Sequence, residues 1–298
     1  MSYFDKLYND YRFILQDKTN SKCLFLGCDE KAINSHIISK KIFKKISKDG
    51  HVYWLFKGKE KHSINYTYTF PAFCKEHDQS LFRKIDREDY KIGNTEQQFL
   101  YFYRSYAGEL VKQMNKLKAI EERDYFTDGK NITMFKNPPQ NLKNQYVLLK
   151  EKFDYLSNLL SSGSFDKIEN FVFTLDKPYP ICVGQYLNID SDFYGKPIKK
   201  LDTGISVVIF PQEDITYVII SWFKEDTINF SFISKTFSEL NQEDKRILLS
   251  MLVLGGCENI AFSIDYWNNI DDKFKIKLKK LYYSPGIEEE INIFIDNE

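Results

Sequence analysis

Residues 23–28, CLFLGC, and residues 74–77, CKEH, place thiol and imidazole side chains in two close pairs. Structural Zn²⁺ takes four such ligands in a tetrahedron, and two short pairs separated by a long segment are typical of its binding loops. The sequence therefore predicts a structural zinc site. Its predicted ligands are Cys23, Cys28, Cys74 and His77. The alternative is that the cysteines are scattered core thiols and the histidines are surface residues.

Composition limits the class of protein. The chain has 298 residues, of which 43% are hydrophobic, and this is enough for a sizeable core and two domains. The longest uncharged apolar run, residues 247–257, is shorter than the roughly 20 residues of a membrane-spanning helix. Asp5 and Lys6 stand where a signal peptide is apolar. We therefore expect a cytoplasmic protein outside the membrane, with Cys182 and Cys257 as buried free thiols.

The formal net charge of zero conceals an uneven distribution. Residues 1–163 hold 28 Lys and Arg against 20 Asp and Glu, a net charge of +8, whereas residues 164–298 carry −8. A basic half that contains the predicted zinc site favours a polyanionic partner. Two oppositely charged domains that attract each other are an equal alternative. The acidic half is the expected contact for a protein partner or a second copy of the chain.

Hydrophobic periodicity and turn residues predict the secondary structure of the first half. Helices are expected at residues 3–16, 40–48, 74–86, 94–126 and 139–160, and strands at residues 51–56 and 63–70. Pro71 is expected to end the second strand. The two long helices have a short link between them, so we expect an antiparallel pair.

The second half is rich in β-branched and aromatic residues. Strands are expected at residues 171–173, 204–210, 215–223 and 228–233, and helices at 241–254 and 271–281. The predicted fold class is α+β. It comprises an N-terminal zinc module at residues 1–92, a helical spacer at residues 93–163 and a C-terminal α+β domain with an antiparallel sheet at residues 164–298.

Residues 35–38, SHII, and residues 73–78, FCKEHD, resemble the treble-clef, ββα-metal module of the HNH endonucleases. In that family one zinc knuckle precedes a strand with the catalytic histidine, and a second knuckle opens the helix that completes the active site. The resemblance covers roughly residues 20–90. The longer pattern SHIISK…FPAFCKEHDQSLF is also similar to an uncharacterised bacterial family. The resemblance implies a metal-dependent endonuclease, and a role in bacterial defence against phage.

Hydrolysis of a phosphodiester needs a base for the attacking water and a cation for the phosphate charge. His36 is the candidate base, because its ordinary pKa lies near neutrality. Asp78 stands where the resemblance places a metal-binding histidine or asparagine, and its carboxylate suits Mg²⁺ or Mn²⁺. Ser35 replaces the residue that shares this metal, and Asn65 is the nearest substitute for a missing asparagine. A structural role for His36 and a helix-start role for Asp78 are the alternatives.

One face of the helix expected at residues 40–48 carries lysines at a spacing suited to phosphates. They are Lys40, Lys41, Lys44, Lys45 and Lys48. The alternative is a solvated helix face. The predicted partner is nucleic acid, DNA rather than RNA. The rival function is a zinc-stabilised protein that binds nucleic acid or another protein and has no catalytic metal.

Overall fold

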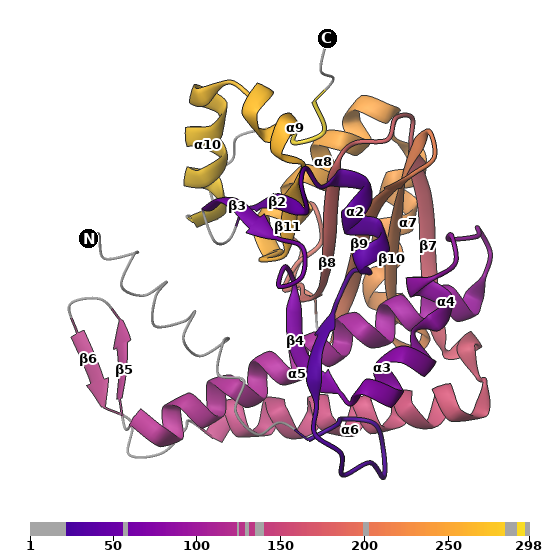
Figure 1. Ribbon diagram of the computed structural model, residues 1–298, viewed down its shortest axis with the longest axis vertical. Coiled ribbons are helices and arrows are strands. Elements are labelled where there is room, and N and C mark those ends of the chain that lie inside the picture. The colour runs from indigo at the N-terminus through magenta and orange to yellow at the C-terminus, as the bar shows by residue number, and fades with distance from the viewer. Residues whose placement is uncertain are drawn as a thin grey trace.

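A seven-stranded antiparallel sheet forms the centre of the protein (Figure 1). The computed structural model describes residues 22–55, 59–123, 125–128, 131–134, 140–198, 203–283 and 291–295, so the helix expected at residues 3–16 lies outside the described residues. The strand order is β3-β2-β11-β8-β9-β10-β7. The strands are β2 His51–Trp54, β3 Lys59–Ser63, β7 Ile168–Leu175, β8 Ile181–Asn188, β9 Gly204–Gln212, β10 Ile215–Phe223 and β11 Ile260–Phe262.

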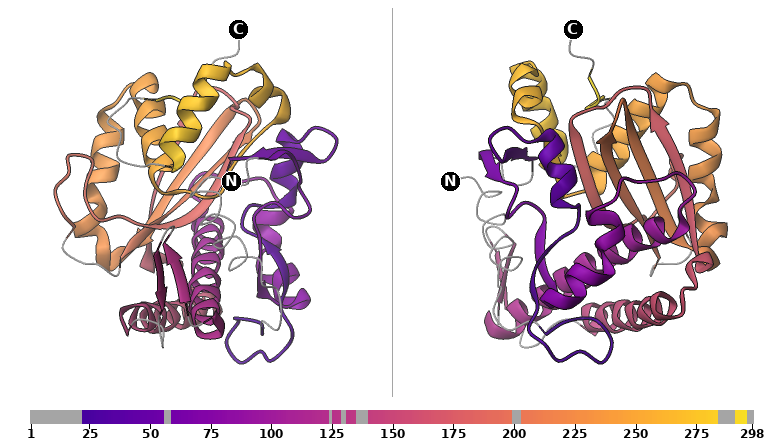
Figure 2. Two further views of the ribbon diagram at one scale, coloured as in Figure 1. Left: turned by 90° about the vertical axis from the view of Figure 1, so that its left-hand side faces the viewer. Right: turned by 45° about the vertical axis from the view of Figure 1, so that its right-hand side comes forward.

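Both faces of this sheet are covered, by helices on one side and by helices and the N-terminal elements on the other (Figure 2). Adjacent residues of β9 belong to different cores, Val208 to the first and Val207 to the second. Strands buried on both faces are hydrophobic throughout, and β9 is buried along its whole length. The helices that contribute to the second core are α7 Thr227–Glu239, α8 Gln242–Gly256, α9 Ile264–Asn269 and α10 Asp272–Tyr283.

Two long helices, α5 Thr95–Arg123 and α6 Gln140–Ser162, form the predicted antiparallel pair. Tyr103 of α5 stacks on Phe153 of α6, whereas Phe99, one turn earlier, meets Phe165 beyond the end of α6. A short hairpin that was not predicted links them, with strands β5 Tyr125–Asp128 and β6 Asn131–Met134. Contacts of α5 with β8, β9 and β10 place it against the sheet.

The N-terminal elements follow a strand, strand, helix order. β1 Ile33–His36 pairs antiparallel with β4 Thr69–Phe73, and α3 Lys75–Leu81 follows β4 directly. Helix α2 Lys40–Ile46 and the β2–β3 hairpin lie in the insertion between β1 and β4. The predicted helix at residues 74–86 is divided at Phe82 into α3 and α4 Arg83–Asp86. The order of β1, β4 and α3 is the one that the resemblance implies, and the treble-clef assignment stays a prediction.

The strand predicted at residues 63–70 is wrong. Residues 64–68 form turns, and Tyr68 has a φ of 55°. The hairpin partner of β2 is β3 instead. Pro71 does not end a strand but lies within β4. A proline is tolerated there because β4 has a single neighbouring strand, β1, within its described sheet, so it is an edge strand.

The strand predicted at residues 228–233 is also wrong, because these residues lie in α7. The buried residues of α7 are Phe230, Ile233 and Phe237, and this spacing of three and four is the pattern of an amphipathic helix. Strands β8 and β11 were not predicted. The helices predicted at residues 241–254 and 271–281 are confirmed as α8 and α10.

The central sheet joins segments that the sequence analysis assigned to different domains. Trp54 of β2 lies opposite Ala261 of β11, and Tyr53 lies opposite Phe262. The α+β class and the antiparallel sheet are confirmed. The three-domain division stays a prediction, although the sheet crosses its boundaries. Within the described residues, no helix combines the length and the hydrophobicity needed to cross a membrane.

Candidate functional site

The four predicted zinc ligands come together at one end of the β1–β4 pair. Their ligand atoms all lie within 4.8 Å of one another. His77 Nδ1 lies 3.4 Å from Cys23 Sγ and 3.2 Å from Cys74 Sγ, and Cys28 Sγ lies 3.9 Å from Cys74 Sγ. Sulfur and nitrogen ligands of a tetrahedral zinc ion are separated by about 3.6–3.8 Å. This Cys₃His group therefore has the donor set and the spacing to hold a metal ion such as zinc.

Local backbone structure positions each of the predicted ligands. The Cys28 amide donates to the Phe25 carbonyl, which closes a turn in which Gly27 has a φ of 78°. The Leu24 amide donates to the Ala72 carbonyl of β4 and brings this turn beside the second pair of ligands. Cys74 is the N-cap of α3 and His77 lies in its first turn, so both side chains face the same point. Among the described residues, no other group of three or more His, Cys, Asp or Glu side chains is placed to hold a metal.

The environment of the cluster is largely apolar. Cys23 and Cys74 are buried, and the ring of Phe25 stacks on His77 with 4.2 Å between the centroids. Burial raises the pKa of the Cys23 thiol to about 12. A metal ion binds the thiolate form, which its charge stabilises. Metal binding and deprotonation of Cys23 are therefore coupled.

His36 ends β1, and its ring has one defined hydrogen bond. Nε2 lies 2.8 Å from the carbonyl oxygen of Ile64. A carbonyl can only accept, so Nε2 carries the proton, and in the neutral ring Nδ1 presents a lone pair. Nδ1 makes no hydrogen bond to any residue that the structure describes. Burial lowers the pKa of His36, although the Ile64 carbonyl acts in the opposite direction, so the ring is neutral at pH 7.

The two residues after His36 fix the end of β1 against the sheet. Ile37 and Ile38 pack between Gly108 of α5 and Gly184 of β8. A Cβ atom at Gly184 would lie 2.7 Å from Ile38 Cγ1 and 2.9 Å from Ile37 Cγ2. Glycine at this position therefore allows the backbone of β8 to approach the segment that carries His36.

We expect Gly184→Ala to destabilise the protein by about 1–3 kcal/mol, because the added methyl group overpacks Ile37 and Ile38. Urea unfolding, with an unchanged m-value, measures this loss. Gly255→Ala is the matched control. Gly255 lies in α8 with open space around its Cα, so alanine is expected to stabilise the protein by up to about 1 kcal/mol through helix propensity. Equal stability of the two variants would contradict the close approach.

Asp78 lies in the first turn of α3 beside an ion pair that was not predicted. Arg104 of α5 is 1% exposed, and its Nη1 and Nη2 donate to the two carboxylate oxygens of Asp86 over 2.7 and 2.8 Å. Asp78 Oδ1 lies 3.6 Å from Arg104 Nη2 and is buried without a hydrogen bond. Arg104 lowers the pKa of His36 and the two carboxylates raise it. All three charges are therefore within electrostatic range of the imidazole.

Two further predicted residues do not join this group. Ser35 is fully buried, and its hydroxyl has no hydrogen-bond partner among the described residues. It precedes His36 in β1, so its side chain points to the opposite face of the strand. Asn65 is exposed in the turn after β3, and only its backbone neighbour Ile64 contacts His36. Neither side chain is shown to take part in the candidate site.

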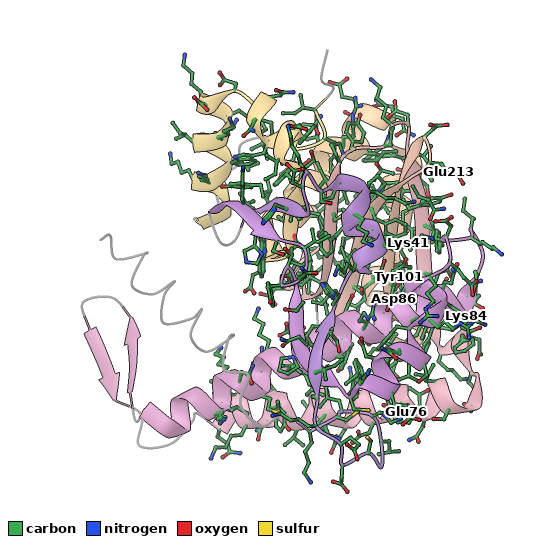
Figure 3. The ribbon with its side chains drawn as sticks, in the orientation of Figure 1. Lys41, Glu76, Lys84, Asp86, Tyr101 and Glu213 are labelled. Carbon is green, nitrogen blue, oxygen red and sulfur yellow. The ribbon has the colours of Figure 1, made fainter. Side chains whose placement is uncertain are left out.

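The predicted lysine face lies on and just after α2, and part of it is already paired. Lys41 and Lys45 lie 2.9 and 3.6 Å from Asp89, and Lys48 lies 2.6 Å from Asp265. In Figure 3, Lys41 lies above Tyr101 and Asp86, which are close together near α5. Lys40 and Lys44 are exposed. The Lys48–Asp265 pair also joins the basic and acidic halves of the chain.

Sequence reasoning missed Arg104 and Asp86. The signal was present in residues 99–107, FLYFYRSYA, where a single arginine interrupts an aromatic stretch of the long helix. A charged residue on the buried face of a helix needs a partner of opposite charge. The sequence alone does not say which carboxylate provides it.

Comparisons with protein-family models, with curated proteins and with solved structures give no match.

Proposed function

We propose that this protein cleaves nucleic acid by metal-dependent hydrolysis of a phosphodiester, with His36 as the general base. The observation that supports the proposal most is the hydrogen bond from His36 Nε2 to the Ile64 carbonyl. It selects the tautomer with a lone pair on Nδ1, which is the form that accepts a proton from water. The lowered pKa of His36 keeps this form populated at neutral pH.

The order of β1, β4 and α3 supports the same proposal, because it brings His36 and Asp78 into one small unit. The Cys₃His group would bind structural zinc and hold the start of α3 against the loop of residues 23–28. Asp78 would hold Mg²⁺ or Mn²⁺, and its buried Oδ1 without a hydrogen bond is a fitting ligand atom. When bound, such a cation neutralises charge on the phosphate and the leaving oxygen.

The nucleic acid would approach over α2, with DNA as the preferred substrate. Lys40 and Lys44 are exposed and one helical turn apart. Lys41, Lys45 and Lys48 can exchange their surface carboxylate partners for phosphates at little cost, because exposed ion pairs contribute only about 0–1 kcal/mol. A defence role against phage would fit a nuclease of this kind, and the acidic half would serve a regulating protein partner or a second copy.

We expect Lys40→Glu/Lys44→Glu to weaken DNA binding and to reduce the slope of log affinity against log salt by about two, since each lysine neutralises one phosphate. Fluorescence anisotropy at several salt concentrations measures both effects. Lys224→Glu/Lys235→Glu is the charge-matched control, because Lys224, just before α7, and Lys235, within α7, are both exposed. Equal losses in the two double variants would show that net charge, and not the α2 face, controls binding.

Cleavage of single- and double-stranded DNA and of RNA by the full chain, with Mg²⁺ or Mn²⁺, tests the enzymatic proposal. The full chain is needed because β2 and β11 share one sheet. We expect products only with a divalent cation, and none when Mg²⁺ and Mn²⁺ are omitted from protein that elemental analysis shows to be zinc-loaded. A zinc-loaded protein that binds DNA but cleaves no substrate with any divalent cation would contradict the proposal.

A second candidate function is a non-catalytic protein that binds nucleic acid or another protein through the same zinc-stabilised unit. The ion pair of Arg104 with Asp86, close to Asp78, favours it, because a guanidinium already neutralises the carboxylates near His36. Burial of Ser35 favours it as well, since this position then supplies no metal ligand. DNA binding without cleavage is the result that this second function predicts.

A further inference from the structure

The charge on Arg104 is held in place by an ion pair, by an aromatic ring and by burial. Both of its terminal nitrogens donate to Asp86, over 2.7 and 2.8 Å. Its guanidinium carbon lies 4.0 Å above the centroid of the Phe82 ring. Its side chain is 1% exposed. A guanidinium does not lose its proton in proteins, so a permanent positive charge is held inside the unit that contains His36.

The carboxylate of Asp78 interacts more weakly with the guanidinium of Arg104 than the carboxylate of Asp86 does. Asp78 Oδ1 lies 3.6 Å from Arg104 Nη2, which is too long for a hydrogen bond but close enough for an electrostatic attraction. The same oxygen is buried and accepts no hydrogen bond. Asp86, in contrast, accepts one hydrogen bond on each oxygen. Asp78 Oδ1 therefore has both of its lone pairs free for a second cation, whereas each Asp86 oxygen retains only one.

A divalent cation on Asp78 would lie close to the guanidinium of Arg104. Two positive charges a few ångströms apart repel each other strongly inside a protein, where screening is weak. With Arg104 in place, the two carboxylates and the guanidinium sum to a single negative charge. Without Arg104 they sum to two negative charges, one of which, on Asp86, has lost both of its hydrogen-bond donors.

We propose that Arg104 is a positioning residue that competes with the divalent cation for Asp78 and keeps the cation affinity of the site low. This inference rests on the proposed metal role of Asp78. In the absence of the cation, the guanidinium of Arg104 neutralises the Asp78 carboxylate, which lies in the first turn of α3. When the cation binds, Asp78 exchanges the guanidinium for the metal, and Asp86 retains Arg104.

The test measures Mn²⁺ binding to the zinc-loaded full chain from the electron paramagnetic resonance signal of free Mn²⁺. Arg104→Gln is expected to bind Mn²⁺ tighter than the wild type by about tenfold or more, because the competing charge is removed. Adding Asp78→Asn to this variant should abolish the gain. Arg246→Gln, which removes a poorly exposed arginine near Asp176, is the control and should leave Mn²⁺ affinity unchanged.

Arg104→Gln leaves two carboxylates without their counter-charge and can prevent folding. Arg104→Met/Asp86→Leu removes the ion pair as a unit, so it avoids an unpaired buried charge. It is also expected to bind Mn²⁺ tighter than the wild type, since Asp78 remains without a competitor. Mn²⁺ affinity at or below the wild-type value in a folded Arg104 variant overturns the inference.

The two proposals fail in different ways. Tighter Mn²⁺ binding by Arg104→Gln without DNA cleavage by any variant supports the competition and contradicts the nuclease. Cleavage by the wild type, together with unchanged Mn²⁺ affinity in Arg104→Gln, overturns the competition and retains the nuclease. A rise in the melting temperature of Arg104→Gln on addition of Mn²⁺, larger than that of the wild type, is a second readout of the same competition.

Discussion

Cys74→Ser is expected to release the metal and to lower the melting temperature by about 10 °C or more, which corresponds to about 6 kcal/mol for a chain of this size. The expected loss is large because α3 has no buried residue. Hydrophobic burial therefore contributes little to its attachment. The N-cap of α3 is retained, because the serine hydroxyl can accept the His77 amide in place of the thiol, so the loss reports on the metal. Elemental analysis and thermal unfolding measure the two effects.

Hydrogen exchange identifies the segments that lose stability in this variant. We expect amides of residues 22–36 and 69–86 to lose protection in Cys74→Ser, whereas β9 and β10 keep theirs, because those strands are buried in the central sheet. Cys257→Ala is the matched control. Cys257 is a buried free thiol outside the metal group, so its removal should leave the zinc content unchanged. Wild-type protein that contains no metal would contradict the candidate site itself.

His36→Ala is expected to reduce cleavage by about 10²–10⁴-fold, the usual contribution of a general base. The zinc content should not change, because His36 is not one of the four ligands. His51→Ala is the matched control, since His51 also contacts a backbone carbonyl, that of Asp49 at 2.7 Å, but lies at the surface. Equal effects of the two substitutions on cleavage would contradict the assignment of the base.

Unfolding alone does not separate the two functions, so it is measured together with cleavage. Loss of the His36–Ile64 hydrogen bond costs about 1–2 kcal/mol. If His36 is purely structural, the His36→Ala variant loses this stability and the wild type shows no cleavage. If His36 is catalytic, the variant loses the same stability and also loses the cleavage that the wild type shows. Parallel unfolding and cleavage measurements on His36→Ala therefore distinguish a structural role from a catalytic one.

The pH dependence has a defined sign. Burial lowers the pKa of folded His36 below its ordinary value of about 6.5. As the pH falls below that value, the unfolded chain binds the proton first, so stability declines until the folded pKa is reached. This component should be absent in His36→Gln. In the wild type, the acid limb of kcat/KM should lie below about pH 6.5, because Nδ1 must be unprotonated to act as a base.

The Cys₃His group was predictable because its chemistry is local. Each pair lies within a few residues, and few side chains other than cysteine and histidine provide such a site. The positions of Arg104 and Asp86 were not predictable, since their ion pair joins α5 to α4 and depends on how two helices pack. The role of Gly184 was not predictable either, because it depends on the packing of β8 against Ile37 and Ile38.

Secondary structure was predicted well where periodicity was long and poorly where it was short. The long helices α5 and α6 and the strands β9 and β10 contain many residues of one pattern. Residues 64–68 and 228–233 contain few, and alternation over five or six residues does not distinguish a strand from a turn or a helix. β8 was missed because Gly184 and Gln185 interrupt its apolar residues, whereas β9 and β10 contain more β-branched residues.

Pairing of β2 with β11 has a consequence for the order in which the chain can fold. The Trp54 indole donates to the Glu258 carbonyl, 204 residues further along the chain. At about 5–20 residues per second, a ribosome needs about 10–40 s to add those residues. During that interval β2 has β3 beside it but not β11, so one edge of the insertion that supplies Ile64 to His36 is unpaired. The surroundings of His36 are therefore completed only after residues 260–262 have been synthesised, and a shorter nascent chain carries an unfinished site.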